Sequence, residues 1–114
     1  METRKKFFKD CYLAGRKYHE ADEVWNQLEV GTELQLVRDL DNRYDVNAVA
    51  VTFKAENGED YLIGYIPQTE NEVLALFLEM GWTDMFECRI SKIDPNAFSE
   101  RQIKLTIKVK RNKV

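Results

Sequence analysis

The chain has 114 residues, 44% of them hydrophobic and 32% charged, so it is long enough for one apolar core and too short for two. No apolar run approaches the roughly 20 residues that cross a membrane, and the N-terminus lacks the apolar stretch of a signal peptide. We therefore expect one domain over residues 1–114, with its core at about 7–110, in the cytoplasm and without a membrane partner.

The two cysteines and the single histidine are too few for a disulfide framework or a convincing zinc site. Cys11 and Cys88 lie in strand patterns, which fits buried free thiols in a reducing compartment. Nothing marks His19 as their catalytic base, and no glycine-rich phosphate-binding motif is present. We expect no metal, no cofactor and no enzyme activity.

The net charge of −3 argues against a nucleic-acid partner, but the charges are unevenly distributed. Residues 1–18 carry six basic and two acidic side chains, and residues 101–114 carry six basic and no acidic ones. Residues 19–100 hold five basic and eighteen acidic side chains. If the two ends lie side by side, they form the local basic surface that a phosphate backbone needs. The alternative is that these lysines are simply solvated.

Four segments in the first half have the pattern of strands, with apolar and polar residues alternating in the clearest of them. They span residues 7–13, 33–38, 48–54 and 61–66. Residues 20–28 form either a short helix or an irregular connection, and Asn57-Gly58 marks a hairpin between the third and fourth strands.

Pro67 ends the fourth strand, and a helix is expected next. Thr69-x-x-Glu72 has the form of a capping box, and Gly81 is placed to end the helix. Its apolar stripe is predicted from four residues: Val73, Leu74, Phe77 and Leu78. Two further strands follow at 86–91 and 103–109, joined by a turn-rich linker.

Six strands with one firm helix, and no strand–helix–strand repetition, indicate a mainly β protein built as a small mixed barrel. The last strand has a clean alternation, with β-branched residues and leucine on its inward face. Its outward face carries Lys104, Lys108 and Lys110, which would form a basic ridge.

The connection before the third strand is the most informative stretch of the chain. Four of its residues have side chains that can bond their own backbone and so favour turns: Asp39, Asp41, Asn42 and Asp45. Tyr44 is thereby held on a loop fixed by a rigid sheet, where binding residues tend to lie. The alternative is a plain turn in which Tyr44 covers an edge of the core.

This stretch, Asn-Arg-Tyr-Asp-Val-Asn-Ala-Val-Ala-Val at residues 42–51, resembles the signature of the HIRAN domain, a small β-barrel module of SWI/SNF-type ATPases. Other marks occur in the family's order: AGRKYH at 14–19, GTELQLVRDLDN at 31–42, IGYIP at 63–67 and NAF at 96–98. The resemblance spans residues 9–110 and implies a partly open, OB-like or SH3-like barrel of six strands with one or two helices.

The resemblance also implies a site that captures the 3′ end of single-stranded DNA. Lys17 stands where the family has a phosphate-contacting arginine, and Tyr18 where it has a stacking tyrosine. Asn42, Tyr44 and Asp45 match the segment that encloses the terminal nucleotide, with Asp45 accepting a hydrogen bond from the 3′-hydroxyl. Two aromatic residues complete the candidate site: Tyr65 and Phe98, the latter matching a ring that packs on a base.

The residues themselves fit such a ligand, because single-strand sites combine cations with aromatic faces on which bases stack. Arg16, Lys17 and Arg43 lie close in sequence to the candidate tyrosines. The match departs from the family at Lys17, which loses the planar fork of arginine, and at Tyr65 and Gln68, where a eukaryotic DNA binder has histidine and lysine.

We therefore interpret the chain as a non-catalytic, nucleic-acid-binding module. Its expected ligand is a single-stranded DNA end with a free 3′-hydroxyl, in DNA repair or processing, with a separate ATPase or nuclease as a further candidate partner. The alternative is a protein-interaction adaptor that uses an exposed edge of the barrel.

Overall fold

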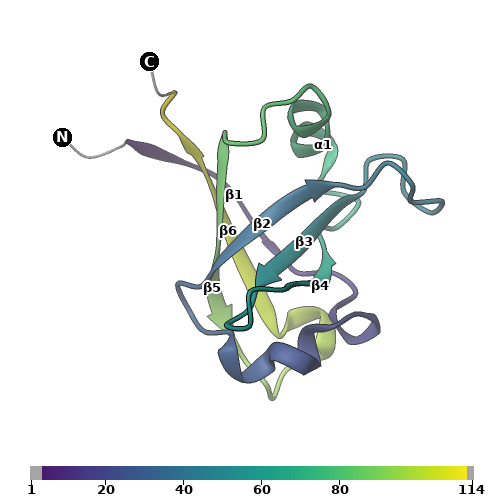
Figure 1. Cartoon of the computed structure of the whole chain (residues 1–114), viewed down its shortest axis with the longest axis vertical. Helices are drawn as coiled ribbons and strands as arrows, with labels where there is room; N and C mark the ends of the chain where they lie inside the picture. The colour runs from purple at the N-terminus through teal and green to yellow at the C-terminus, as the bar shows by residue number, and fades with distance from the viewer. Residues whose placement is uncertain (1–3, 113–114) are drawn as a thin grey trace.

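The computed structural model describes residues 4–112, which form one six-stranded antiparallel sheet in the order β1-β6-β5-β2-β3-β4 (Figure 1). The strands are β1 (Lys5–Tyr12), β2 (Glu33–Arg38), β3 (Val49–Lys54), β4 (Asp60–Tyr65), β5 (Phe86–Ile93) and β6 (Ile103–Lys110). All six occur where the alternation predicts them, with boundaries that shift by a few residues.

The sheet curls until its two edge strands, β1 and β4, approach each other. They meet through the residue that follows β1's end: the Ala14 N–H donates to the Tyr65 carbonyl at 2.8 Å, and the Tyr65 N–H donates back at 2.9 Å. A Cβ on Gly64 would lie 2.6 Å from the Ala14 carbonyl oxygen, so this close approach requires glycine. The predicted mainly β, partly open six-stranded barrel is confirmed.

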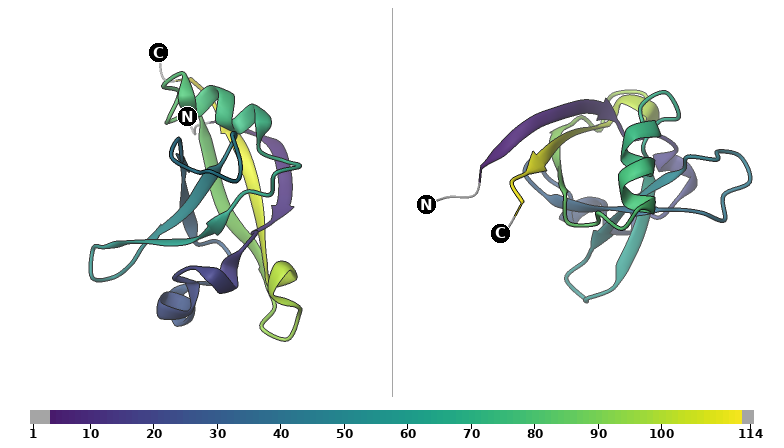
Figure 2. Two further views of the ribbon diagram at one scale, coloured as in Figure 1. Left: turned by 90° about the vertical axis from the view of Figure 1, so that its right-hand side faces the viewer. Right: turned by 90° about the horizontal axis from the view of Figure 1, so that it is seen from above.

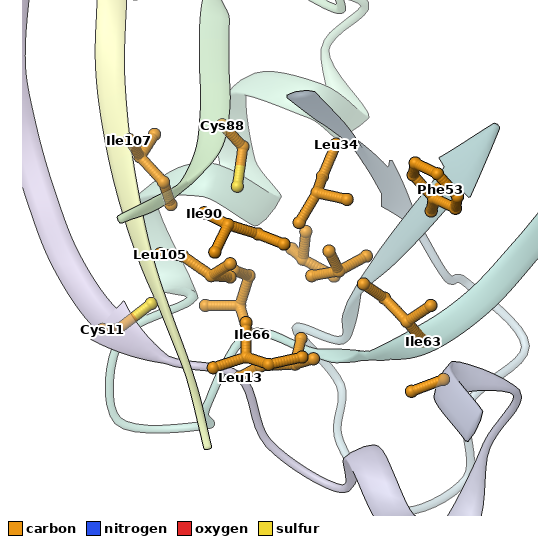
Figure 3. Close-up of a cluster of buried hydrophobic side chains, with 14 of the residues drawn as sticks. Cys11, Leu13, Leu34, Phe53, Ile63, Ile66, Cys88, Ile90, Leu105 and Ile107 are labelled. Atoms are coloured by element: carbon orange, nitrogen blue, oxygen red, sulfur yellow. The ribbon is translucent and has the colours of Figure 1, made fainter. Parts of the chain in front are cut away.

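The interior of the barrel is filled by the inward face of each strand (Figure 3). Ile103, Leu105 and Ile107 of β6 are fully buried, as their alternation predicts. Cys11 and Cys88 also face this core as free thiols. Burial raises the pKa of the Cys11 thiol to about 11, which keeps it in the unreactive protonated form.

Four short helical segments connect the strands. Three are 3-10 turns, η1 (Arg16–Tyr18), η2 (Ala21–Gln27) and η3 (Ser99–Arg101), and the fourth is the α-helix α1 (Glu72–Glu79). The segment 20–28 is therefore helical, in the tighter 3-10 form. None of the described helices is long and apolar enough to cross a membrane.

The helix α1 ends as predicted but begins differently. Gly81 has a φ of 93°, and the Trp82 N–H donates to the Phe77 carbonyl at 3.0 Å, which closes the last turn. The predicted capping box is wrong, because α1 begins at Glu72 with Asn71 as its N-cap residue. Val73, predicted on the buried stripe, is 41% exposed because the helix buries Leu74, Ala75 and Leu78 instead.

The basic ends of the chain lie side by side, as the charge distribution suggested. Strand β1 pairs with β6 along its length, and Lys5 lies opposite Lys110. Several of these lysines are paired with acidic side chains, however. Lys5 contacts Glu87 at 2.6 Å, and Lys110 contacts Asp84 at 2.7 Å. The ends therefore form a surface that is only partly basic.

Candidate functional site

The connection between β2 and β3, residues 39–48, is shaped by its own side chains. Asn42 Oδ1 accepts from the N–H groups of Tyr44 at 2.8 Å and Asp45 at 3.0 Å. Asp39 Oδ1 accepts in the same way from the Asp41 N–H at 3.2 Å. The expected turn is present, and it projects the Tyr44 ring into solvent with 87% of its surface exposed.

Arg38, at the end of β2, stabilises this loop by binding its backbone. Its guanidinium donates to the backbone carbonyls of Ala48 at 2.9 Å and Val46 at 2.5 Å. It also pairs with Glu79 of α1 at 3.0 Å. The sequence pattern gave no sign of this role, because Arg38 reads there as an outward residue of a strand.

Asp45 is fixed by a residue that the sequence analysis assigned to no site. Asn71 is only 1% exposed, and its Nδ2 donates to Asp45 Oδ2 at 2.7 Å. Asp45 Oδ1 accepts from the Asn47 N–H at 2.9 Å. Each carboxylate oxygen has two lone pairs, so a half-buried, oriented Asp45 can still accept a further hydrogen bond.

Gln68 fixes the backbone of the neighbouring tyrosine. Its Nε2 donates to the Tyr44 carbonyl at 3.1 Å, across the gap between the loop and the segment after β4. The residue that departs from the family pattern therefore has a positioning contact of its own in this chain.

Tyr65 joins three parts of the molecule. Its hydroxyl donates to Asp39 Oδ2 at 2.7 Å and lies within reach of the Asn42 side chain. Its ring packs on the His19 ring with 5.3 Å between centroids. Burial, and then the hydrogen bond to Asp39, raise the pKa of Tyr65, so its hydroxyl remains a neutral donor. Tyr65 thus fixes the position of the loop at residues 39–48 through Asp39. The exposed aromatic rings are those of other residues, Tyr18, Tyr44 and Phe98.

The turn η1 presents two of the candidate residues to solvent. Tyr18 is 75% exposed, and Lys17 Nζ lies 5.2 Å from the centroid of its ring. Arg16 faces the other way: it is buried, contacts Asp22 at 2.7 Å and stacks over Trp25 at 4.4 Å. The expectation that Arg16 supplies a cation to the tyrosines is wrong, because its charge is used inside the fold.

Phe98 stands apart from the loop. It precedes η3 and is 79% exposed, and η3 lies beside η1 at the lower end of the barrel, below the level at which residues 39–48 project from its side (Figures 1 and 2). The structure therefore brings Asn42, Tyr44, Asp45 and Tyr65 together. It links Lys17 and Tyr18 to them through the contact between His19 and Tyr65.

We call the surface that runs from this loop past η1 to Phe98 the loop face; it consists of residues 15–19, 39–48, 65–68 and 94–98. It carries three exposed rings on three separate segments, those of Tyr18, Tyr44 and Phe98. In the part of the chain that the structure describes, Lys17 and Arg43 form no ion pair with an acidic residue. The face can therefore offer stacking surfaces, free cations and one oriented carboxylate.

The loop face holds no candidate metal centre. Among residues 4–112, no group of three or more His, Cys, Asp or Glu side chains is arranged to hold a metal ion. The carboxylates of Asp39 and Asp45 are bound instead to a hydroxyl, an amide side chain and backbone N–H groups. Their chemistry is that of hydrogen-bond acceptors.

The family model described as the HIRAN domain matches residues 7–110 of this chain. Two solved structures share its fold. A crystal structure of a protein from Lactobacillus plantarum is 19% identical, with a TM-score of 0.75, over 97% of this chain and 100% of that one. The crystal structure of the HIRAN domain of human HLTF is 18% identical, with a TM-score of 0.66, over 96% and 81%. No curated protein matches the sequence.

Proposed function

This chain belongs to the HIRAN domain family, and on that premise we propose that it recognises single-stranded DNA ends that carry a free 3′-hydroxyl. HIRAN domains are known as nucleic-acid-binding modules. The observation that supports this proposal most directly is the loop face. It exposes the rings of Tyr18, Tyr44 and Phe98, at 75%, 87% and 79%, and the cations Lys17 and Arg43 adjoin the two tyrosines.

In this proposal the last bases of the strand stack on the exposed tyrosines. Tyr44 is the strongest candidate because its backbone is held at both N–H and carbonyl, by Asn42 and Gln68. An exposed ring on a fixed backbone loses little conformational entropy when a base packs on it. Tyr18 and then Phe98 offer further rings toward the other end of the loop face.

Asp45 would accept a hydrogen bond from the terminal 3′-hydroxyl. Its carboxylate is already oriented by Asn71 and by the Asn47 N–H, and it retains free lone pairs. A negative charge at this point repels a phosphate in the place of the hydroxyl. The geometry thus supports discrimination between a free 3′ end and a strand that continues.

The charge balance supports weak, salt-sensitive binding. The body of the protein is acidic, Lys17 offers a point charge without the fork of arginine, and Arg16 is unavailable. We therefore propose a recognition module for DNA repair or processing, whose chemistry is supplied by a separate ATPase or nuclease.

Fluorescence anisotropy at low salt would test this proposal, with a labelled strand of about a dozen nucleotides ending in either a 3′-hydroxyl or a 3′-phosphate. The strand with the 3′-hydroxyl should bind more tightly than the strand with the 3′-phosphate. Asp45→Asn should reduce this difference in affinity, because asparagine can still close the turn but carries no charge. Equal binding of both ends to the unmodified protein would contradict end capture. Binding of neither would contradict the nucleic-acid proposal.

The alternative function, an adaptor that accepts a partner's strand, is restricted by the structure to one edge. The β4 edge is covered, since the Glu20 N–H donates to the Leu62 carbonyl and Glu20 Oε1 accepts from the Leu62 N–H. Strand β1 forms the other edge of the sheet. Binding of a peptide there would depend little on ionic strength, whereas DNA binding should fall steeply with salt.

A further inference from the structure

The outward face of β1, β6 and β5 contains a row in which two lysines lie opposite each other beside a tyrosine. Lys92 of β5 lies directly opposite Lys104 of β6, which in turn lies directly opposite Tyr12 of β1. Like charges in directly opposed positions destabilise a sheet. The Lys92–Lys104 pair therefore costs stability, and an external anion that bound between the two lysines would relieve their repulsion.

A third cation joins this row from η3. The Arg101 guanidinium and Lys104 Nζ each lie 5.8 Å from the centroid of the Tyr12 ring. We call the group of Tyr12, Lys92, Arg101 and Lys104 the outer cluster. Lys92 and Arg101 are exposed, and Tyr12 and Lys104 are half-buried.

The positive charges of the outer cluster are not balanced by ion pairs, whereas those of other lysines on the same strands are. Lys5 and Lys110 are paired with Glu87 and Asp84. None of the ion pairs between described residues includes Lys92, Arg101 or Lys104.

The nearest acidic residues along the chain and in the adjacent row are already bonded. Asp10, one row away, accepts from the Thr106 hydroxyl at 2.6 Å. Asp94 accepts from the Asn96 N–H at 3.0 Å, and Glu100 from the Ser99 hydroxyl at 2.9 Å. These carboxylates lower the positive potential around the cluster without forming an ion pair with it.

The outer cluster adjoins the lower end of the loop face. Arg101 is the last residue of η3, which begins directly after Phe98, and Tyr12 immediately precedes the segment that leads into η1. The turns η1 and η3 lie side by side at this end of the barrel (Figures 1 and 2). Aromatic and basic groups thus follow one another from Tyr44 through Tyr18 and Phe98 to the outer cluster.

We propose that the outer cluster binds the phosphates of the same DNA strand, upstream of its captured 3′ end. This inference rests on the proposed function and adds to it a second contact region with a defined direction along the ligand. A strand that passes Phe98 reaches Arg101 first and then Lys104 and Lys92, and the Tyr12 ring between Arg101 and Lys104 offers a stacking surface. A strand too short to pass Phe98 makes none of these contacts.

The experiment compares two 3′-hydroxyl strands, one of about four nucleotides and one of about sixteen, the range of site sizes for small barrel domains. Each is titrated at several salt concentrations against the unmodified protein and the Lys92→Gln/Lys104→Gln double variant. The single variant Arg101→Gln is measured in the same way. Lys54→Gln is the control, because Lys54 lies on the β3–β4 hairpin and pairs with Asp60 at 3.2 Å.

The long strand should bind the unmodified protein more tightly than the short one. The double variant should bind the long strand about tenfold more weakly at low salt, with a slope of log K against log salt smaller by about 1.4, or about 0.7 per lost contact. Arg101→Gln should reduce the slope by about 0.7. The short strand should bind all these variants equally, and Lys54→Gln should match the unmodified protein.

Two results would overturn the inference, and they are distinguishable. If the 3′-hydroxyl strands bind but length and the double variant have no effect, the outer cluster carries no phosphate and the proposed function stands. If neither strand binds the unmodified protein, both proposals fail together. Circular dichroism and the unfolding midpoint of each variant confirm that a loss of binding is not a loss of fold.

Discussion

The loop face and a second surface region both expose aromatic side chains, but the charges around them differ. The second region, which we call the terminal groove, lies between the C-terminal end of α1 and the ends of β5 and β6. Four apolar residues contribute to its lining: Phe77, Trp82, Met85 and Val109. Trp82 is 57% exposed there, while Tyr44 on the loop face is 87% exposed.

The difference between the two regions lies in how polar groups are used. At the terminal groove, Lys110 is paired with Asp84, and the neighbouring Lys5 is paired with Glu87. On the loop face, Asp39 and Asp45 are bonded to a hydroxyl and an amide group, and the exposed cations Lys17 and Arg43 remain outside the ion pairs of the described residues. An exposed aromatic ring is therefore a weak sign of a nucleic-acid site until the state of the charges around it is known.

The largest effect on stability is expected from opening the seam, the backbone bridge between Ala14 and Tyr65 that joins the two edges of the sheet. In Gly64→Ala, the new Cβ would lie 2.6 Å from the Ala14 carbonyl oxygen and 2.7 Å from the Leu13 side chain. We expect the free energy of unfolding to fall by about 3 kcal/mol, as for severe overpacking, in urea titrations. Gly58→Ala has open space around it but a φ of 85°, and should cost only about 1 kcal/mol. Equal losses would contradict this account of the seam.

Replacing one aromatic residue in each region by alanine would test whether only the loop face binds DNA. Tyr44→Ala should weaken binding of the 3′-hydroxyl strand by about 1–3 kcal/mol, the scale of one lost base stack. Trp82→Ala removes a larger ring from the terminal groove and should leave the affinity unchanged. Anisotropy measures both, and the unfolding midpoint shows that each variant is folded. If Trp82→Ala had the larger effect on binding, the site would belong at the terminal groove.

The smallest effect concerns the paired charges near the terminal groove. The hydrogen bond from Lys5, and the charge of Arg89, hold the pKa of the buried Glu87 carboxyl below its usual range despite its burial. The unfolded chain then takes up this proton at a higher pH than the folded protein. The stabilisation is present above the ordinary glutamate pKa and is lost as the pH falls through the folded value.

Glu87→Gln should therefore flatten the acid side of the stability profile, measured by urea unfolding between about pH 7 and about pH 3. The variant should be less stable than the unmodified protein at neutral pH and should approach it in acid. An unchanged dependence on pH would show that the contact between Lys5 and Glu87 contributes little in solution.

Much of the fold could be predicted from the sequence because periodicity is a local signal. The alternation of Ile103, Leu105 and Ile107 defined both a strand and its buried face. The turn at Asn42 could be predicted for the same reason, since its amide bonds residues two and three positions ahead. At the start of α1 a local signal misled, because Thr69 and Glu72 have the spacing of a cap but Asn71 occupies that position.

The contacts that assemble the candidate site could not be predicted, because they join residues far apart in the sequence. Asn71 reaches Asp45 across 26 positions, and Tyr65 reaches Asp39 across the same number. Nothing near Arg16 in the sequence reveals that Trp25 and Asp22 draw it into the fold. The separation of Phe98 from the loop likewise depends on where η3 lies in the barrel.

Tyr65 couples the opening of the barrel to the order of the loop at residues 39–48. Its backbone forms a bridge with Ala14 that joins the two edges of the sheet, and its hydroxyl bonds Asp39 of the loop that presents Tyr44. When this seam opens transiently, the support of the loop opens with it. Opening of the barrel edges and disordering of the loop are then coupled. A bound ligand that needs the ordered loop would therefore also slow amide hydrogen exchange at Ala14 and Tyr65.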